Sequence, residues 1–344
     1  MNVLSLFDGI SCGRVALERC GFTINKYYAS EIDKYAITVA ANNYLDTIHI
    51  GDVTKVRAED LEPIDLLIGG SPCQGFSFAG KQLNFEDPRS KLFFEFVRLL
   101  KECKPKYFFL ENVVMKKEYQ DVISSYLGVQ PIMLNSALVS AQSRKRLYWT
   151  NITGYTPPED KGILLRDIVH EHCLTDRDKS HAIIASIGRT TTREYFQKNQ
   201  GQMVAQFNVN PSGKGMNGIV RSVNNPKSNC LTTNKGEGQK ISFPFDQEPY
   251  FEKYVSGRPT PISAEKHPCL RAQAGSRTKG IAVSQADGYW RKLTPIECER
   301  LQTLPDNYTA GVSNSQRYKM LGNGWTVDAV CEFFKHIPKD LDLF

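Results

Sequence analysis

The stretch that decides the fold is IDLLIGGSPCQGFS, which covers residues 64–77. Ile64 to Ile68 form a short apolar run with little alternation, and this pattern predicts a strand buried on both faces. The run ends at two glycines, and Cys73 follows between a proline and a glutamine. Open α/β sheets bind their ligands at the carboxyl ends of the strands. We therefore expect either a turn that happens to contain Cys73 or a nucleophilic cysteine at a ligand-binding edge.

Around this stretch, the first half of the chain alternates between strand-like and helix-like segments. Short apolar strands are expected at 3–7, 27–30, 48–50, 107–110 and 147–152. Helices are expected between them at 13–20, 35–40 and 90–103. Such alternation predicts an α/β fold with a doubly wound, mostly parallel sheet of the Rossmann-like kind, covered by helices on both faces.

The composition changes after Ile152. Gly, Asn, Ser, Thr and Lys become frequent and helical periodicity fades, until Arg291 restores a helical pattern with Thr294 as N-cap and Pro295 in the first position. A last helix is expected over 326–334. We predict a catalytic domain made of residues 1–152 and 290–344, with a smaller, loop-rich domain, residues 153–289, inserted between the two parts.

The net charge of +6 is concentrated in this inserted domain, which holds 18 Lys and Arg against 13 Asp and Glu. Between Arg189 and Lys240 there are eight basic residues and two acidic ones. A local excess of positive charge suits a polyanionic partner. A merely water-exposed surface explains the charge equally well.

The nine cysteines are scattered, form no CxxC pair and fit a reducing compartment. His170, His172 and Cys173 are crowded together, but no partner pair lies nearby, so we expect a solvated segment and no metal site. The chain has no apolar stretch of membrane-spanning length, and its first residues lack the regions of a signal peptide. We therefore expect a cytoplasmic protein.

Three of the predicted strands end in residues suited to a nucleoside. The first strand runs into the glycine-containing turn Leu6 to Gly13, which allows a ligand to approach backbone N–H groups closely. Glu31 ends the second strand, where a carboxylate can accept hydrogen bonds from a ribose diol. Asp52 follows the third strand and can accept from an adenine amine. Each carboxylate alone is more often a cap or a surface residue, but together they predict a nucleoside-binding edge.

Cys73 belongs to the same edge, because it follows the fourth strand. Glu111 ends the adjacent fifth strand, and Arg144 and Arg146 precede the strand expected at 147–152. A thiol, a carboxyl group and two guanidinium groups are therefore expected to converge beside the nucleoside. A purely structural cysteine needs none of these neighbours, so the pattern favours the nucleophile.

Taken in order, these motifs resemble those of the cytosine-C5 DNA methyltransferases, which use S-adenosylmethionine. The resemblance runs from residue 4 to about residue 330 and leaves only the inserted domain without clear motifs. It is carried by FDGISCG, Glu31, GDV, SPCQGFS, EDPRSKLFF, LENV, QSRKR, RKLTPIECERLQTLP and GNGWTV.

The resemblance implies a reaction and a role for each catalytic residue. The Cys73 thiolate would add to C6 of cytosine, and Glu111 would bond the N3 and amine edge and supply a proton. Arg146 would contact the cytosine O2, while Arg144 would support the target phosphate or the nucleophile loop. The implied cofactor is S-adenosylmethionine, which leaves as S-adenosylhomocysteine, with no metal. The implied partner is double-stranded DNA with its target base flipped out, and no membrane or obligate protein partner is evident.

The resemblance also implies the binding residues. Phe7 and Ile32 would sandwich the adenine; the alternative for both side chains is ordinary packing in the core. The full cofactor set is expected to be Phe7, Asp8, Gly9, Ile10, Ser11, Cys12, Glu31, Ile32, Asp52, Val53, Pro72, Leu92, Asn323, Gly324 and Trp325. The expected DNA contacts are Gln74, Ser77, Arg89, Lys214, Asn217, Arg221 and Thr232.

Some positions depart from the commoner bacterial pattern. Trp325 stands where a small apolar residue is usual, and it can pack either on the cofactor or in the core. Cys230 and Cys269 each precede a leucine where a Thr-Leu pair usually marks the recognition region. Asn217 would replace the extruded base opposite its guanine, or simply occupy a turn before Gly218.

Two alternatives share much of this pattern. A transfer-RNA cytosine-5 methyltransferase has the same catalytic motifs, but usually a different tripeptide after the nucleophile and a smaller recognition domain. A catalytically silent DNA-binding relative is disfavoured because Cys73, Glu111, Arg144 and Arg146 are all present.

A zinc cytidine deaminase needs P-C-x-x-C, and Pro72 to Phe76 lacks the second cysteine.

Overall fold

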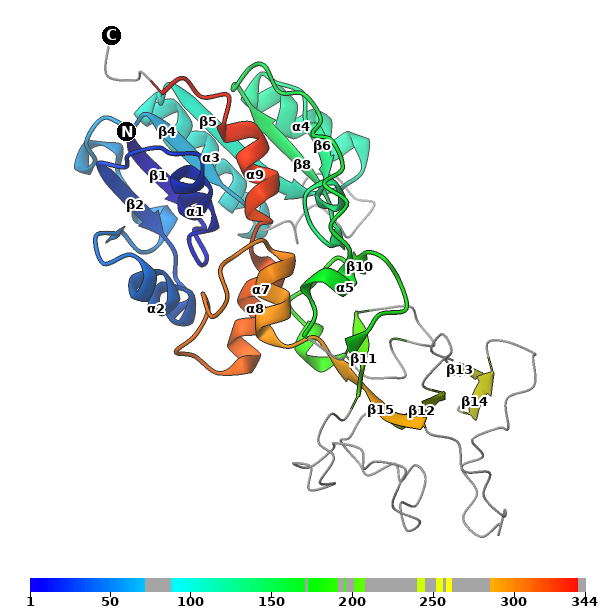
Figure 1. Cartoon of the computed structure of the whole chain (residues 1–344). Helices are drawn as coiled ribbons and strands as arrows, with labels where there is room; N and C mark the ends of the chain where they lie inside the picture. Colours follow the sequence, from blue (N-terminus) through cyan, green and yellow to red (C-terminus); the bar gives the residue numbers. More distant parts are fainter. Residues whose placement is uncertain are drawn as a thin grey trace, which may run out of the picture.

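A computed structural model of the chain describes most of its first half and its carboxyl-terminal segment. The described residues are 1–71, 88–170, 173–190, 195, 201–207, 240–244, 252–255, 258–261 and 285–339. Their centre is a seven-stranded sheet in the order β3-β2-β1-β4-β5-β8-β6 (Figure 1). The strands are β1 (Asn2–Leu6), β2 (Lys26–Ser30), β3 (Ile48–His49), β4 (Leu66–Gly69), β5 (Tyr107–Val113), β6 (Ile132–Asn135) and β8 (Lys145–Thr150).

The first five strands pair in parallel, whereas β8 runs antiparallel to both β5 and β6. Parallel neighbours require crossovers, and the helices α1 (Cys12–Arg19), α2 (Lys34–Asn43) and α3 (Pro88–Cys103) provide three of them. The doubly wound, mostly parallel sheet predicted from the sequence is therefore confirmed, and the three helices lie within a few residues of their expected positions.

The sheet is buried on both faces because adjacent residues of a strand point in opposite directions. In β1, Val3 packs with α1 and with α9 (Val327–Phe334) in one apolar cluster. Its neighbour Leu4 packs with α3 and with α4 (Lys117–Leu127) in the other cluster. Figure 1 shows α1 and α9 together on the near face of the sheet. The unbroken apolar runs of β1 and β4 follow from this double burial.

The returning segment begins at α7 (Pro295–Leu301), which starts as its sequence predicts. The Thr294 side chain accepts a hydrogen bond from the Glu297 backbone, and the Glu297 carboxylate accepts one from the Thr294 backbone, which completes a capping box. Glu297 is also paired with Arg291 through two hydrogen bonds of 2.7 Å. This pairing fixes the point at which the chain re-enters the catalytic part, before α8 (Asn314–Asn323) and α9.

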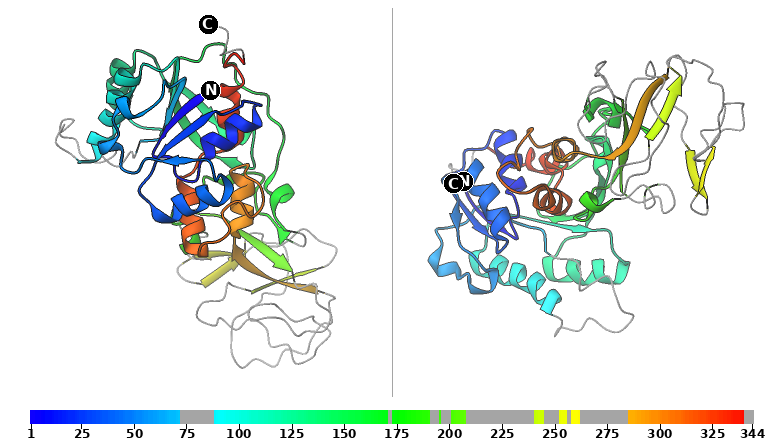
Figure 2. Two further views of the ribbon diagram at one scale, coloured as in Figure 1. Left: turned by 90° about the vertical axis from the view of Figure 1, so that its left-hand side faces the viewer. Right: turned by 90° about the horizontal axis from the view of Figure 1, so that it is seen from below.

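The middle of the chain contributes shorter elements. Figures 1 and 2 show β11 (Met203–Phe207), β12 (Lys240–Pro244) and β15 (Gln285–Lys292) projecting beyond α7 and α8, on the far side from the amino terminus. They form a sheet in the order β12-β15-β11-β9, where β9 is Cys173–Leu174. A separate hairpin joins β13 (Glu252–Val255) and β14 (Arg258–Pro261). Strand β15 runs through the boundary expected between residues 289 and 290.

The beginning of the predicted inserted domain packs on the catalytic part. Strand β10 (Ser180–His181) pairs with β7 (Gln142–Ser143), and α5 (Leu165–Ile168) packs against α7. Leu165, Ile183 and Ile187 belong to the same apolar cluster as α1 and α9. Residues 153–190 therefore share a core with the catalytic part, and the division at residue 153 stays a prediction.

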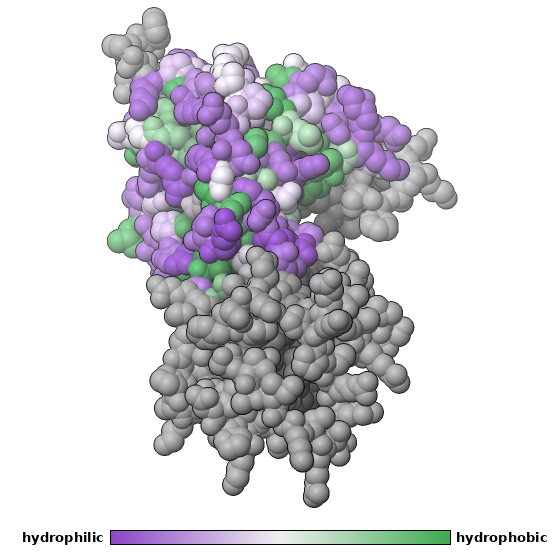
Figure 3. All heavy atoms as spheres, turned by 45° about the vertical axis from the view of Figure 1, so that its right-hand side comes forward, coloured by the Kyte–Doolittle hydropathy of each residue, from purple (hydrophilic) through white to green (hydrophobic). Residues whose placement is uncertain are grey.

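The surface in Figure 3 is mainly hydrophilic over the described residues, with apolar side chains scattered among them. Scattered apolar residues of this kind are normal on a globular protein. Within the described ranges, no helix has both the length and the apolar character needed to cross a membrane.

Candidate active site

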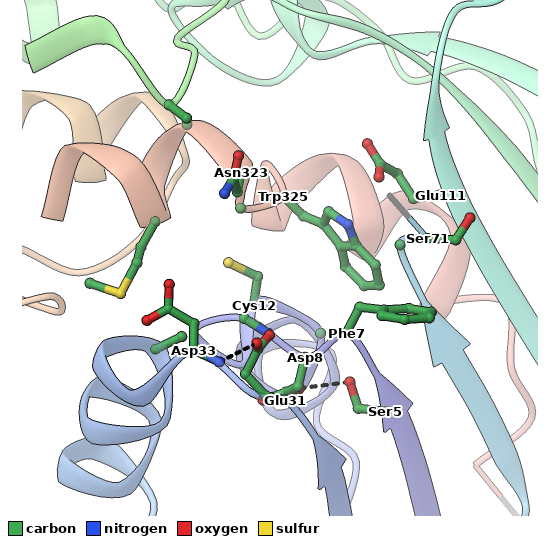
Figure 4. Close-up of a pocket in the computed structure, with 18 of the residues that line it drawn as sticks. Ser5, Phe7, Asp8, Cys12, Glu31, Asp33, Ser71, Glu111, Asn323 and Trp325 are labelled. Atoms are coloured by element: carbon green, nitrogen blue, oxygen red, sulfur yellow. Dashed lines mark hydrogen bonds between the residues drawn. The ribbon is translucent and has the colours of Figure 1, made fainter. Parts of the chain in front are cut away.

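One pocket opens at the carboxyl edge of the parallel strands, as the sequence predicted. It has a volume of about 590 Å³ and takes its walls from the ends of β1, β2, β4 and β5, from β8 and from the end of α8. Figure 4 shows Glu31 and Asp33 at one end, Glu111 at the other, and Asn323 and Trp325 between them. The predicted nucleoside-binding residues Glu31 and Asp52 and the predicted catalytic residues Glu111 and Arg146 therefore line one cavity.

The turn after β1 is stabilised by hydrogen bonds to the side chain of Asp8. The Asp8 carboxylate accepts hydrogen bonds from three hydroxyl groups, at 2.6 Å from Ser5, 2.5 Å from Ser11 and 2.7 Å from Tyr27. Burial raises the pKa of Asp8 despite these donors. Gly9 has a φ of 60°, a conformation that glycine adopts without strain. Asp8 thus braces the turn, so that the Gly9 backbone can face the pocket.

Glu31 is fixed by backbone donors on both of its oxygens. Oε2 accepts from the Gly9 N–H at 2.8 Å, and Oε1 accepts from the N–H groups of Ile32 and Asp33, each at 2.8 Å. Each carboxylate oxygen can accept more than one hydrogen bond, so this carboxylate keeps acceptor capacity toward the pocket. A preorganised carboxylate at the end of the second strand fits a ribose diol.

The end of the pocket where adenine is predicted to bind combines an acceptor with apolar walls. Asp52 caps a short 3-10 helix by accepting from the Thr54 backbone at 3.0 Å, and this hydrogen bond lowers the pKa of Asp52. Phe7, Val53 and Leu92 line the same pocket, together with Ile32, whose side chain is 76% exposed. An exposed isoleucine at a pocket mouth suits a flat aromatic ligand. The groups present fit an adenosine-containing cofactor.

The opposite end of the pocket holds the paired acid and base. Glu111 and Arg146 form an ion pair of 2.9 Å between Oε1 and Nε, and both side chains are largely buried. Strand pairing brings them together, because the antiparallel β8 places Arg146 beside Val113, two residues after Glu111. The Asn112 amide donates to the Ser71 carbonyl and hydroxyl oxygens, each at 3.3 Å. Asn112 therefore ties β5 to the segment that leads to Cys73.

Arg144 is buried and holds two segments of the chain, one at Ile183 and one at Gly322 and Gly324. Its guanidinium donates to the carbonyls of Ile183 at 2.6 Å, Gly322 at 3.1 Å and Gly324 at 3.0 Å. Burial, together with the neighbouring charge of Arg146, lowers the pKa of Arg144 to about 10. Because these carbonyls engage both ends of the guanidinium, Arg144 is a positioning residue in this structure, and its expected support of a phosphate stays a prediction.

Trp325 packs in the core and also reaches the pocket wall, and its contact with the cofactor stays a prediction. Its indole packs edge-on against Phe109, with ring centroids 5.8 Å apart, and it also lines the pocket. A Cβ added at Gly70 would lie only 3.0 Å from the indole Nε1. The indole therefore occupies the space that a side chain at position 70 would need.

Cys12 also lines the pocket, but its environment disfavours nucleophilic chemistry. The thiol is 4% exposed, and burial raises the pKa of Cys12 to about 12. Since the thiolate is the reactive form, a buried thiol of this kind is inert near neutral pH. This leaves Cys73 as the candidate nucleophile.

Several expected residues lie elsewhere. Ile10 and Ser11 are buried behind the turn and do not line the pocket. The remaining candidates fall outside the residues whose side chains the structure describes, namely Pro72, Cys73, Gln74, Ser77, Arg89, Lys214, Asn217, Arg221 and Thr232. The departures at Cys230 and Cys269 fall there too. Among the described residues, no three His, Cys, Asp or Glu side chains gather as a metal site requires.

Several pocket residues were not predicted from the sequence, among them Asp33, Lys319, Ile184 and Ala185. Lys319 and Asp33 form an ion pair of 2.6 Å at the wall of the pocket, and Ile184 and Ala185 come from the segment after β10. Lys319 lies four residues before Asn323, so the GNGWTV motif was a usable signal for it. Ile184 and Ala185 lie in no motif and carry no sequence signal.

The mostly parallel, doubly wound sheet with a pocket at its carboxyl edge has the fold of the class I methyltransferases. Solved structures share this fold: the Entamoeba histolytica methyltransferase EhMeth matches with a TM-score of 0.63 and 15% identity, covering 99% of this chain and 98% of that one. The chain belongs to the C-5 cytosine-specific DNA methylase family, which it matches over residues 1–339.

Individual relatives agree with this assignment. The orphan methyltransferase M.SPRI of Bacillus phage SPR is 30% identical, over 98% of this chain and 97% of its own length. The type II methyltransferase M.HhaI of Haemophilus parahaemolyticus is 29% identical, over 96% and 92%. The resemblance inferred from the motifs is confirmed, and the chain is a DNA (cytosine-5-)-methyltransferase of a family that uses S-adenosylmethionine.

The fixed carboxylate of Glu31 leads to a prediction about cofactor binding. Glu31→Ala is expected to weaken binding of S-adenosylhomocysteine by about 1.5–3 kcal/mol, up to roughly two orders of magnitude, because a charged hydrogen bond is lost. Isothermal titration calorimetry measures the change. Glu59→Ala, at an exposed position outside the pocket, is the matched control and should bind like the parent. An unchanged affinity of Glu31→Ala would refute the ribose role.

Proposed function

We propose that the chain transfers a methyl group from S-adenosylmethionine to C5 of a cytosine flipped out of double-stranded DNA, through a covalent adduct between Cys73 and C6. The observation that carries the proposal is the single cavity, which joins the fixed Glu31 carboxylate to the Glu111–Arg146 pair. A cofactor and a base bound at these two ends would lie side by side.

The cofactor, when bound, supplies a methyl group on a positively charged sulfur that leaves as a neutral thioether. On our proposal Glu31, Asp52 and the backbone of the turn after β1 hold its adenosine. Asn323, the last residue of α8, and Gly324, which follows it, close the pocket beside Cys12. A Cβ added at Gly324 would lie 3.3 Å from the sulfur of Cys12. The acceptors, the N–H groups and the apolar walls of the pocket all support this placement.

The residues at the other end would activate the cytosine, whose C5 is a poor nucleophile. The Cys73 thiolate adds to C6, and the electron pair of the C5–C6 double bond becomes available at C5 while Glu111 delivers a proton to N3. Arg146 orients the base through O2 and holds Glu111 in place. After C5 has bonded to the methyl carbon, the C5 proton passes to water and the C6–S bond breaks to release the Cys73 thiolate. N3 returns its proton to Glu111, which restores both the ring and the enzyme.

The DNA contacts belong to the proposal as well. A target atom inside a duplex is out of reach, so the base must be extruded. We assign closure over the extruded base to Gln74, Ser77 and Arg89, and sequence readout to the inserted domain, residues 153–289, within which Lys214, Asn217, Arg221 and Thr232 are the candidates. The excess of basic residues between 189 and 240 supports contact with phosphates. The reaction is assigned to the cytoplasm of a bacterium, whether the gene is the host's or a phage's.

Bisulfite sequencing of DNA from cells that express the chain tests the proposal. Cytosines in one short sequence context should resist conversion in cells with the parent protein, and none should resist with Cys73→Ala. Bisulfite sequencing of transfer RNA from the same cells tests the RNA alternative. Protected cytosines in transfer RNA, with none in DNA, would overturn the assignment to DNA.

A further inference from the structure

Ile184 is an apolar side chain that water reaches and that nevertheless lines the pocket. It is 50% exposed, although most large apolar residues of the catalytic part are buried. Among the exposed large apolar residues of the described ranges, only Ile32 shares this position in the pocket wall. Burial of apolar surface is favourable, so a ligand that covers such a side chain gains affinity from it.

The backbone around Ile184 is held by the catalytic part. The Ile183 carbonyl accepts from the Arg144 guanidinium at 2.6 Å, and the Ile183 N–H donates to the Gln142 side chain at 3.3 Å. The Ile184 carbonyl accepts from the Ile187 N–H at 2.9 Å, which closes a turn. The position of Ile184 is therefore set before any ligand binds.

A second contact fixes the same segment against α8. A Cβ added at Gly322 would lie 2.1 Å from both the carbonyl carbon of Ile184 and the backbone nitrogen of Ala185. Only a glycine permits so close an approach of two backbones. Gly322 directly precedes Asn323 and Gly324, and Gly324 approaches the sulfur of Cys12 at the start of α1. Figure 4 shows Asn323 and Cys12 among the residues that line the pocket.

Through Gly322, the Ile184 backbone lies against the end of α8, and the end of α8 and the start of α1 both line the pocket. We propose that Ile184 is a cofactor-contacting residue, whose side chain covers the methylene groups of the methionine arm of S-adenosylmethionine opposite the turn after β1. The inference rests on the proposed function, because it takes that cofactor as the ligand. It adds a contact from residues 153–289, the range assigned above to target recognition.

The contact predicts a specific loss of affinity. Ile184→Ala is expected to weaken S-adenosylhomocysteine binding roughly three- to tenfold in isothermal titration calorimetry, because several methyl and methylene groups no longer meet the ligand. Ile184→Val, which keeps most of the side chain, should stay within about twofold of the parent. The melting temperature of the ligand-free protein should not change, since the side chain is already half exposed.

Leu45→Ala is the matched control. Leu45 is 95% exposed, lies outside helices and strands like Ile184, and does not line the pocket. Its replacement should leave binding unchanged. A parent protein that fails to bind S-adenosylhomocysteine would contradict the proposed function itself. If the parent and Ile184→Ala bind S-adenosylhomocysteine equally well, the proposed contact is wrong. If Ile184→Ala then raises only the KM for DNA, Ile184 contacts the target nucleotide and not the cofactor.

Discussion

Glu111→Gln is expected to slow methyl transfer by on the order of 10²- to 10⁴-fold, the usual contribution of a positioned proton donor or acceptor. Glutamine has nearly the same shape, so the side chain should keep its place at the end of β5, where residue 111 is 9% exposed. An amide cannot deliver a proton to N3, and it loses the ionic part of the interaction with Arg146, now 2.9 Å long. The rate of the chemical step should therefore fall while the pocket stays intact.

Single-turnover transfer of a tritiated methyl group to DNA measures this rate. Calorimetric binding of S-adenosylhomocysteine serves as the check on the pocket and should stay within about threefold of the parent. Glu118→Gln, at an exposed position on α4, is the matched control. A Glu111→Gln enzyme that retains more than about a tenth of the parent rate would exclude a role for Glu111 in proton transfer.

Cys73→Ala is expected to abolish methyl transfer and to leave cofactor binding intact. Addition of a thiolate to C6 must precede reaction at C5, so no residual pathway of comparable rate is available. Ser71 lies two residues before Cys73, and its backbone and hydroxyl oxygens accept hydrogen bonds from Asn112. Cys103→Ala, at a half-buried thiol on α3 outside the pocket, is the control. Substantial turnover by Cys73→Ala in the same tritium assay would rule out the covalent mechanism.

Much of the fold follows from local sequence. The apolar runs that became β1, β4 and β5 are short and unbroken, and only strands buried on both faces need such runs. Strand β6 was not predicted, because it lies at the edge of the sheet and mixes buried Leu134 with Met133, which is 58% exposed. Helix α8 was not predicted either, because few of its residues are apolar and no helical periodicity is visible. It buries only Met320, Leu321 and Gly322.

The candidate site also contains residues that could be predicted from the sequence and contacts that could not. Glu31, Asp52 and Glu111 could be predicted because parallel strands carry whatever follows them to one edge. Other contacts join residues that are far apart in the sequence. The Arg144 guanidinium donates to carbonyls of distant segments, and Ile184 contacts Gly322, more than 130 positions away. Such contacts are determined by tertiary packing, and no spacing in the sequence predicts them.

The most direct test of the central claim is a covalent trap. A duplex that carries 5-fluorocytosine at the target position should, in the presence of S-adenosylmethionine, form an adduct that survives denaturation, because fluorine cannot leave C5 as a proton does. We predict an intact mass equal to protein plus methylated DNA strand, with the modified peptide containing Cys73. The absence of any adduct, from an enzyme that methylates the same duplex carrying ordinary cytosine, would contradict attack by Cys73 on C6.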